Sequence, residues 1–337
     1  MALRVLASGR LPERWVRRFD EGYDFTYYEW DESQPVATED ELVARIAGQQ
    51  VFITEEDGVT REVLERSPDL AIVIDTRAAP VNVDVDAATE HGVVVINTPG
   101  RNADAVGDLT VMMMIMAMRN VWPGLVSVRD GTWVERGLLP SYLANQGFEL
   151  REKTIGLVGL GATGLATARR LAGFGARLVA ADPFVTSTVA DSVDAELIEL
   201  DEVLHTADIV SLHVPLMPAT TGMIGARELG LMKPTAYLVN CARARLVDAD
   251  ALLATLRAGR IAGAALDVFT REPLPMDDPL LELPNVVALP HLGGATHEVT
   301  DHQSRIAWEA LEAFLAGGAI NVVNREAISA ARARLER

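Results

Sequence analysis

The sequence predicts an α/β fold made of two domains, each with a doubly wound parallel β-sheet. Three observations support this prediction. The chain has 337 residues, more than one hydrophobic core usually organises. Its first hundred residues alternate short apolar runs with helical stretches, and the same alternation begins again at Thr154. Such alternation of strands and helices favours parallel sheets covered by helices on both faces.

The elements of the first half follow in order along the chain. Short apolar, β-branched runs predict buried strands at "RVLAS", "QVFIT", "AIVID" and "VVVIN". Apolar residues at helical spacing predict helices between them, such as "EDELVARIAGQQ" and "TREVLERS".

The second half repeats the pattern after a long connecting helix. The predicted strands are "TIGLVG", "ARLVAAD", "DIVSLHV", "AYLVN", "AGAALDV" and "VVALP". The connecting stretch, "NADAVGDLTVMMMIMAMRN", is helical and rich in methionine. We interpret it as a core or subunit-contact helix, because methionine fills irregular gaps in packed cores.

Composition restricts the classes of partner. Hydrophobic residues make up 49% and charged residues 23%, as in folded globular proteins. Forty-eight acidic residues against 30 basic ones give a net charge of −18, which repels nucleic acids and anionic membranes. We therefore expect neither as a partner, and we expect any anionic substrate to be held by local arginines.

The sequence also indicates location and metal content. The N-terminal segment lacks a signal-peptide pattern, and the longest strongly apolar run without charge, Leu109 to Met118, is ten residues long. These features predict a cytoplasmic protein. One cysteine excludes an internal disulfide and a zinc site of several thiolates, and the six histidines show no metal-ligand spacing, so we expect no metal.

A glycine motif opens the second half. After the strand "TIGLV" the chain reads Gly159-Leu160-Gly161-Ala162-Thr163-Gly164 and continues into a helical stretch. In G-x-G-x-x-G the first glycine permits a tight turn, the second lets the backbone approach a pyrophosphate, and the third lets the helix pack on the strand. Free N–H groups at the helix start, which Ala162 and Thr163 would supply, face the anion. The motif predicts a Rossmann domain.

Asp182 identifies the dinucleotide. It ends the next predicted strand, eighteen residues after Gly164, where a carboxylate can accept hydrogen bonds from both hydroxyls of an adenosine ribose. A 2′-phosphate would meet this carboxylate as a like charge, and the following "PFVTSTVADS" contains no compensating basic residue. The sequence therefore predicts NAD rather than NADP.

Several motifs together resemble the NAD-dependent D-2-hydroxyacid dehydrogenase family, which includes phosphoglycerate dehydrogenases and glyoxylate or hydroxypyruvate reductases. They occur in the family's order and spacing and cover nearly the whole chain: "GLVGLGATG", "ADPF", "LHVPLMPATTGMIG", "VNCARARLVD", "AALDVFTREPLP" and "LPHLGGAT". The resemblance implies an oxidoreductase that transfers a hydride between NAD(H) and a small 2-oxo acid or D-2-hydroxy acid.

The resemblance implies three catalytic residues, Arg243 in the N-x-A-R element, Glu272 in D-V-x-x-x-E-P and His291 in P-H. These residue types suit the chemistry. A guanidinium can fork onto the carboxylate of a 2-oxo acid and polarise its carbonyl. An imidazole can deliver the proton that follows the hydride, and a carboxylate on its far nitrogen would orient the ring and favour its charged form. Arg245 is the alternative to Arg243 by spacing alone, because both can face one side of an extended segment.

The remaining cofactor contacts that the resemblance implies are Val214, Pro215, Cys241, Asp267 and Gly294. Asp267 would hold the nicotinamide amide, and Val214 and Pro215 would contact the cofactor through their backbone. Cys241 would line the nicotinamide pocket, with a plain buried thiol as the other interpretation. We expect His213 to be a packing residue rather than a second base.

The segment after the predicted strand "AIVID" corresponds to the family's substrate loop. By resemblance, Ala78 and Ala79 bind substrate through backbone amides, in a loop that is usually rich in glycine; alanine keeps the amide but resists positive φ. Arg77 and Arg101 are the basic residues expected nearby. Each either binds a phosphate or second carboxylate of a larger substrate or is simply solvated, so a phosphorylated substrate stays open.

The resemblance also implies the domain boundaries. Residues 1–100 and 295–337 would form a discontinuous, flavodoxin-like substrate domain, and residues 101–294 the Rossmann domain. The segment "VWPGLVSVRDGTWVERGLLPSYLANQGFEL" is similar to the family's dimerisation arm, which predicts a homodimer.

Two other functions stay open on the same fold. One is a NAD-sensing scaffold, since transcriptional corepressors similar to this family keep the fold and even the catalytic residues. The other is a phosphite-type dehydrogenase. A formate-type enzyme is disfavoured, because those enzymes carry glutamine where Glu272 stands.

Overall fold

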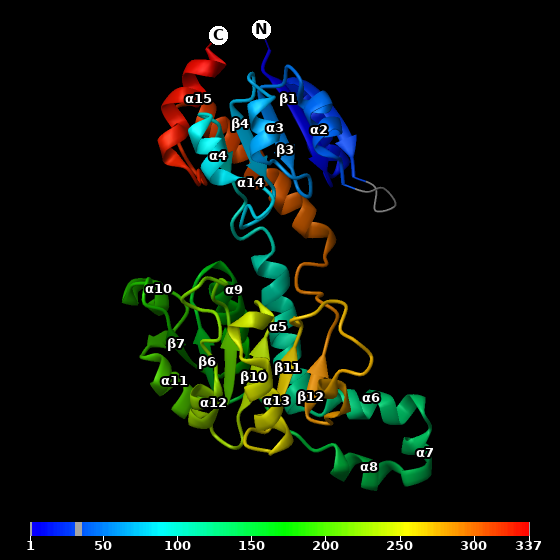
Figure 1. The fold of residues 1–337 in the computed structure, drawn as a ribbon. Coiled ribbons are helices and arrows are strands. Elements are labelled where there is room, and N and C mark those ends of the chain that lie inside the picture. Colours follow the sequence, from blue (N-terminus) through cyan, green and yellow to red (C-terminus); the bar gives the residue numbers. More distant parts are fainter. Residues whose placement is uncertain (1, 31–35, 337) are drawn as a thin grey trace. The chain divides into compact units, whose positions relative to one another are not determined.

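The computed structural model describes residues 2–30 and 36–336 and divides into two compact units. Unit 1 comprises Met1–Arg101 and Thr296–Arg337, and unit 2 comprises Asn102–Ala295. Within the described residues, unit 1 contains a five-stranded sheet and unit 2 a seven-stranded sheet (Figure 1). All strand pairs in both sheets are parallel, which confirms the predicted fold class.

Unit 1 has the strand order β2-β1-β3-β4-β5 of flavodoxin-like folds. Its strands are β1 (Arg4–Gly9), β2 (Asp24–Glu29), β3 (Val51–Thr54), β4 (Ile72–Asp75) and β5 (Val94–Ile96). Its helices are α1 (Glu13–Gly22), α2 (Glu39–Ile46), α3 (Arg61–Glu65), α4 (Val85–Glu90), α14 (His297–Leu315), α15 (Ile328–Leu335) and the short 3-10 helix η4 (Arg325–Ala327).

Helices cover both faces of the sheet in unit 1. Phe19 of α1 and Phe314 of α14 pack on one face, and Leu42 of α2 and Val63 of α3 on the other. Every residue of β3, β4 and β5 is therefore buried, as expected for strands covered on both faces. The register aligns the ends of β1, β3 and β4, so the loops that follow these strands meet at one edge.

Unit 2 has the strand order β12-β11-β10-β9-β6-β7-β8. Counted from β6, this is the Rossmann order 3-2-1-4-5-6 with one added strand. The strands are β6 (Thr154–Val158), β7 (Arg177–Ala181), β8 (Ala195–Leu197), β9 (Ile209–Leu212), β10 (Tyr237–Asn240), β11 (Gly263–Leu266) and β12 (Val286–Ala288).

The helices of unit 2 are α5 (Ala103–Met118), α6 (Val121–Arg129), α7 (Thr132–Arg136), α8 (Leu138–Ala144), α9 (Ala162–Leu171), α10 (Ser187–Asp191), α11 (Leu200–Thr206), α12 (Ala226–Leu231) and α13 (Ala249–Arg257). The 3-10 helices are η1 (Ala172–Phe174), η2 (Ala244–Leu246) and η3 (Pro279–Glu282).

The methionine-rich helix α5 is a core helix. Met113, Met114 and Met118 are buried in the core of unit 2. A Cβ on Gly107 would lie 3.2 Å from Ala166 of α9, so the missing side chain lets the two helices approach closely. Within the described residues, no single helix has both the length and the apolar composition needed to cross a membrane; only α5 and α6 together, bent by 74°, meet that test.

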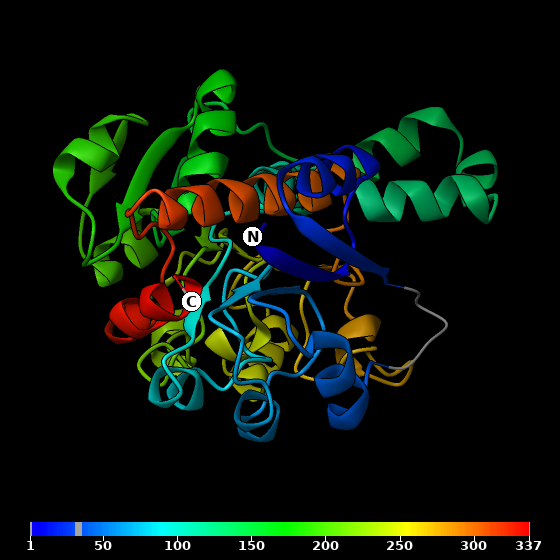
Figure 2. The same cartoon turned by 90° about the horizontal axis from the view of Figure 1, so that it is seen from above.

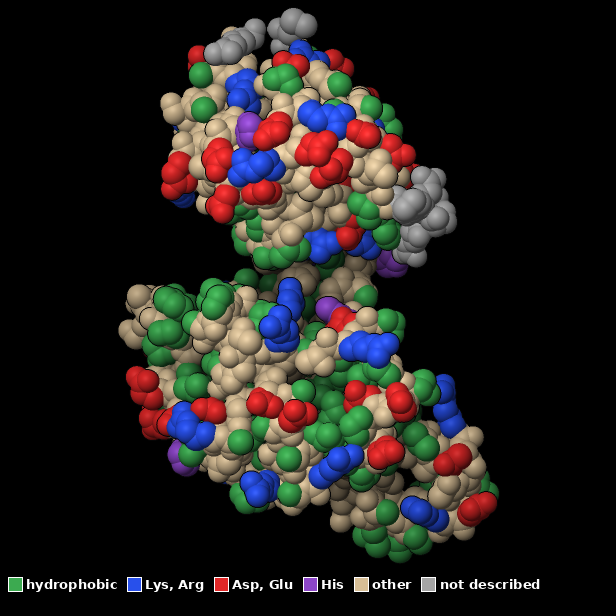
Figure 3. Space-filling model, in the orientation of Figure 1, with side chains coloured by type: hydrophobic (Ala, Val, Ile, Leu, Met, Phe, Trp, Pro, Cys, Tyr) green, Lys and Arg blue, Asp and Glu red, His purple; other side chains and the backbone are tan. Residues whose placement is uncertain are grey.

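Helices α6, α7 and α8 form an arm that projects from the sheet of unit 2 in both ribbon views (Figures 1 and 2). Neither α6 nor α7 has a buried residue. Large apolar side chains are exposed along the arm, among them Trp122 at 53%, Val134 at 81% and Leu138 at 75%. Figure 3 shows hydrophobic side chains along the lower edge of the arm, over α8. Exposed apolar surface of this extent is typical of a contact with another chain.

Candidate active site

The turn between β6 and α9 carries the three motif glycines in distinct environments. Gly159 has a φ of 96°, and a Cβ there would lie 2.8 Å from Val214. A Cβ on Gly164 would lie 2.3 Å from the Gly159 carbonyl oxygen, so α9 packs directly on the turn. A Cβ on Gly161 would meet nothing within 4 Å, which leaves open space in front of the turn. These environments suit a tight turn, close helix packing and the approach of a pyrophosphate.

Asp182 lies beside this turn. It follows β7; its Oδ2 accepts a hydrogen bond from the Leu160 N–H at 2.8 Å, and its Oδ1 accepts one from the Phe184 N–H at 2.9 Å. Each carboxylate oxygen keeps a lone pair for a ribose hydroxyl. The start of α9, with the N–H groups of Ala162 and Thr163, completes a donor and acceptor set that fits the adenosine and pyrophosphate of NAD.

Replacing Asp182 with serine is expected to lower kcat/KM for NADH by about 10- to 100-fold, because the ribose loses hydrogen bonds to a charged group. The same change should raise kcat/KM for NADPH, because the carboxylate no longer repels the 2′-phosphate. Steady-state rates with both cofactors measure the change. Asp191→Ser is the matched control, because Asp191 is an exposed aspartate on α10. An unchanged preference between the two cofactors in Asp182→Ser would contradict this assignment.

His291 and Glu272 form a hydrogen-bonded pair. The imidazole Nδ1–H donates to Glu272 Oε2 at 2.6 Å, and Glu272 Oε1 accepts from the Phe269 N–H at 2.8 Å. Burial alone would raise the pKa of Glu272, but the hydrogen bonds from His291 and Phe269 and the positive charge of Arg243 outweigh it and lower that pKa. Glu272 is therefore an ionised partner that leaves the other ring nitrogen of His291 free for chemistry.

The backbone of His291 is held in an unusual conformation. Its φ is 56°, in the left-handed region that non-glycine residues rarely occupy. Asp267, fully buried just after β11, fixes the next two residues: its carboxylate oxygens accept from the Leu292 N–H at 2.7 Å and the Gly293 N–H at 2.8 Å. Burial raises the pKa of Asp267, although these two hydrogen bonds oppose the shift. Asp267 thus stabilises the strained loop that presents the imidazole.

Arg243 lies on a loop shaped by Asn240, the last residue of β10. The Asn240 side chain donates to the Arg243 carbonyl at 3.0 Å and accepts from the Ala242 N–H at 3.0 Å. Arg243 is exposed, and its Nη1 donates to the Ala242 carbonyl at 2.7 Å. Its charge contributes to the lowered pKa of Glu272, whereas Arg245 is exposed within η2. This favours Arg243 over Arg245 as the cation beside the pair.

Burial shifts the pKa values of two other side chains, Cys241 after β10 and His213 after β9. Burial raises the pKa of the Cys241 thiol to about 12, which favours the interpretation as a plain buried thiol. Burial lowers the pKa of His213 to about 4, and its Nε2 lies 3.0 Å from Ser211 Oγ. His213 is therefore a neutral packing residue. Within the described residues, no group of three or more His, Cys, Asp or Glu is placed to hold a metal.

The loop after β4 in unit 1 presents unpaired backbone amides. Ala78 and Ala79 are exposed, and neither has a positive φ, so the alanines fit the loop without strain. Among the described residues, their N–H groups donate to no other group, while Asn97 Nδ2 donates to the Ala78 carbonyl at 2.7 Å. Two adjacent free amides are suited to a carboxylate.

At the base of this loop lies Asp75, the last residue of β4, which is completely buried. Its Oδ1 accepts from the Arg77 N–H at 3.0 Å, but its Oδ2 has no hydrogen-bond partner among the described residues. Burial raises the pKa of Asp75 to about 7. Because the folded state holds this proton more tightly than the unfolded state, Asp75 favours folding at low pH, and that advantage is lost as the pH rises toward and above 7.

Replacing Asp75 with asparagine is therefore expected to raise the free energy of unfolding by about 1 kcal/mol at pH 8 and by less at pH 5, because the buried charge is removed. Urea unfolding of both proteins at the two pH values measures the difference. Equal destabilisation by Asp75→Asn at pH 5 and pH 8 would show that the buried carboxylate does not destabilise the folded state.

Sequence reasoning missed three structural roles at these edges. It did not find the Phe269 N–H as a partner of Glu272, the Asp267 carboxylate as the anchor of the His291 loop, or Glu55 as an acceptor for arginines in unit 1. Only the role of Glu55 could have been predicted from the sequence, since the acidic run after "VFIT" lies directly beyond a strand end. The other two depend on loop geometry that local sequence does not encode.

A Rossmann sheet, an open glycine turn with an acidic partner, and an Arg-His-Glu set at the ends of β10, β11 and β12 define a dinucleotide-dependent oxidoreductase. Residues 111–293 match the family model described as "D-isomer specific 2-hydroxyacid dehydrogenase, NAD binding domain". The chain belongs to the D-isomer specific 2-hydroxyacid dehydrogenase family.

Individual relatives support this membership. A glyoxylate reductase of Thermococcus litoralis is 34% identical over 98% of this chain and 99% of its own length. A D-3-phosphoglycerate dehydrogenase of Methanocaldococcus jannaschii is 38% identical over 85% of this chain; the chain spans about half, 54%, of that relative. The NAD-complexed family member from Lactobacillus delbrueckii ssp. bulgaricus has a TM-score of 0.80 at 26% identity, over 95% of this chain and 100% of that structure. These findings confirm the predicted NAD cofactor and the predicted class of enzyme, a dehydrogenase of 2-hydroxy acids.

Proposed function

We propose that this protein reduces a small 2-oxo acid to the D-2-hydroxy acid with NADH, and catalyses the reverse reaction at higher pH. The observation that carries the proposal is the 2.6 Å hydrogen bond between His291 Nδ1 and Glu272 Oε2, next to the charge of Arg243. Arg243 binds the carboxylate and polarises the carbonyl, His291 is the acid, and Glu272 orients it.

Each side chain has a separate task in the proposed reaction. NADH, when bound at the glycine turn, supplies the hydride. As negative charge develops on the carbonyl oxygen, the Arg243 guanidinium stabilises it, and His291 delivers a proton from Nε2, the ring nitrogen that does not face Glu272. Glu272, kept ionised by its lowered pKa, stabilises the imidazolium before the transfer.

Unit 1 is proposed to be the substrate domain and unit 2 the NAD-binding domain. The free N–H groups of Ala78 and Ala79 would donate to the substrate carboxylate. Asp182, Gly161 and the start of α9 would hold the adenosine and pyrophosphate of the cofactor. Val214 and Pro215 would contact the cofactor through their backbone, and Gly294 would also contact it.

The proposal is tested by NADH oxidation with purified full-length protein and a panel of 2-oxo acids: glyoxylate, pyruvate, hydroxypyruvate and 2-oxopentanoate. We expect turnover with at least one, and a D-configured product where the product is chiral. NADH binding without turnover of any member would overturn the proposal and favour the sensing scaffold. NAD⁺ reduction with phosphite alone would favour the phosphite-type alternative.

We also propose an assembly and a location for the protein. The apolar side chains exposed along α6, α7 and α8 support a homodimer formed through the arm. Light scattering of the full chain is expected to give twice the chain mass of 36.4 kDa, and a monomer would contradict the proposal. A cytoplasmic location is consistent with the single unpaired cysteine, Cys241.

A further inference from the structure

The carboxyl edge of the sheet in unit 1 gathers three arginines near the proposed substrate loop. Arg10 follows β1, Arg77 lies two residues beyond β4, and Arg101 ends the first segment of unit 1. In doubly wound folds, ligands bind beyond this edge, where the strand order reverses; here that point is between β1 and β3. An arginine with a free guanidinium would therefore suit a phosphate or a second carboxylate on the substrate.

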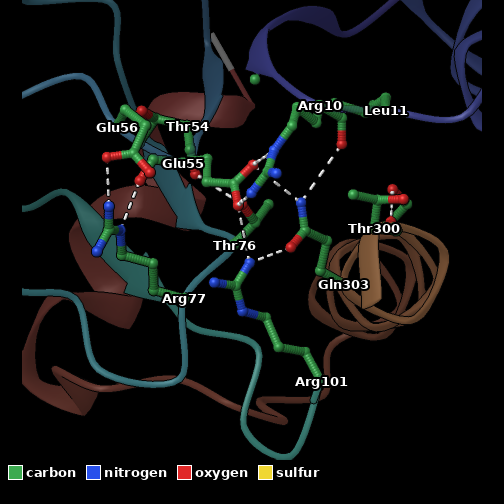
Figure 4. Close-up of polar contacts among 12 residues, drawn as sticks. Arg10, Leu11, Thr54, Glu55, Glu56, Thr76, Arg77, Arg101, Thr300 and Gln303 are labelled. Carbon is green, nitrogen blue, oxygen red and sulfur yellow. Dashed lines mark hydrogen bonds and ion pairs between the residues drawn. The ribbon is translucent and has the colours of Figure 1, made fainter. Parts of the chain in front are cut away.

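Glu55, the residue after β3, accepts hydrogen bonds from two of these arginines. Arg10 Nη2 donates to Glu55 Oε1 at 2.7 Å, and Arg101 Nη1 donates to the same oxygen at 3.0 Å. Gln303 of α14 donates to Glu55 Oε2 at 3.2 Å and accepts from Arg101 (Figure 4). Burial alone would raise the pKa of Glu55, but the two arginines outweigh it and lower that pKa. The side chain is 2% exposed, so this network is built into the fold.

Arg77 is engaged by a second carboxylate. Its Nε donates to the Glu55 carbonyl at 2.7 Å, and its Nη2 pairs with Glu56. Figure 4 shows the Arg77 guanidinium turned toward Glu56. The pair is partly exposed, with 31% of the Arg77 side chain and 36% of the Glu56 side chain accessible. Glu56 is thus the group that a competing anion would have to displace.

Each of the three guanidinium groups at this edge is already engaged by a glutamate carboxylate. The loops at this edge also carry the buried carboxyl groups of Asp57 and Asp75. The buried side-chain atoms around the loop that lack a hydrogen-bond partner among the described residues are oxygens: Asp75 Oδ2, Asn82 Oδ1 and Thr98 Oγ1. An added phosphate or carboxylate would therefore have to displace one of the glutamates from its arginine.

From the proposed function, which this step rests on, we infer that the enzyme selects 2-oxo acids whose far end is uncharged or cationic and rejects those with a phosphate or a second carboxylate there. Glu56 is the specificity-determining residue, because it neutralises Arg77, the arginine of the substrate loop itself. The two arginines that the sequence left open as phosphate ligands are structural ion-pair partners instead.

The test compares substrates that share the reacting end and differ at the far end. Steady-state kcat/KM with NADH is measured for hydroxypyruvate against phosphohydroxypyruvate, and for 2-oxopentanoate against oxaloacetate. We expect the uncharged member of each pair to be preferred, by about 100-fold or more for the phosphate pair, because like charges brought together cost several kcal/mol. Equal or better turnover of either anionic member overturns the inference while leaving the proposed function intact.

A variant of Glu56 tests whether its charge, rather than its size, sets the preference. Glu56→Gln leaves Arg77 without its anionic partner and is expected to reduce the preference for hydroxypyruvate over phosphohydroxypyruvate about tenfold. Glu90→Gln is the control, since it also removes the carboxylate of an ion pair in unit 1, the exposed pair with Arg61, and should leave the preference unchanged. An unchanged preference in Glu56→Gln refutes the role of Glu56. If no 2-oxo acid is turned over by the unmodified protein, the proposed function fails and this inference fails with it.

Discussion

Replacing His291 with asparagine is expected to lower kcat for reduction of the preferred 2-oxo acid about 10³-fold, within the range of a lost general acid. The affinity for NADH should change little, because His291 lies on the loop after β12 rather than at the glycine turn. Stopped-flow single turnovers and NADH fluorescence titration measure the two quantities separately.

Two further variants define the cause of that loss. Glu272→Gln keeps the shape of the pair but removes its negative charge, so the rate of reduction should fall less and its pH profile should move toward acid. His205→Asn, on the exposed face of α11, is the control and should keep full activity. A His291→Asn enzyme with normal kcat would show that water or another group supplies the proton.

Replacing Arg243 with alanine is expected to lower kcat/KM about 10³-fold, because the substrate carboxylate and the developing oxyanion both lose their cation. Arg245→Ala is a matched comparison two residues away and is expected to cost less than about threefold, in line with an exposed charge. Steady-state kinetics with saturating NADH measures both. The reverse outcome, with Arg245→Ala the damaged enzyme, would assign the substrate carboxylate to Arg245.

The succession of buried strands along the chain was predictable from the sequence, because continuous apolar runs are a strong signal. Two of the four edge strands, β2 and β8, were not predicted. Every residue of β2, "DFTYYE", is exposed or half-buried, and β8 has only three residues, so neither forms an apolar run. The helical arm was expected only by resemblance to the family, because its exposed apolar residues follow no clear helical stripe.

The candidate site was predictable where a motif names both the residue type and the strand end that carries it. Gly161, Asp182, Arg243, Glu272 and His291 all lie on loops that directly follow strands of unit 2. Their catalytic roles stay predictions, although the structure does pair His291 with Glu272.

What the sequence could not provide is the pairing of charges between distant segments. Arg77 and Arg101 looked equally suited to bind a phosphate or to be solvated. The acceptor that engages Arg101 lies 46 residues away, and the glutamine that completes the network lies 202 residues away. Such partners are set by the register of β1, β3 and β4 and by the position of α14, which no local pattern specifies.

The most direct test of this account is a crystal structure of the protein with NAD and oxamate, an unreactive analogue of a 2-oxo acid. The account predicts that the Arg243 guanidinium contacts the oxamate carboxylate and that His291 Nε2 lies within hydrogen-bond distance of the oxygen at the reacting carbon, with Glu272 still on Nδ1. Oxamate bound away from both side chains, or an imidazole turned away from it, would contradict the account.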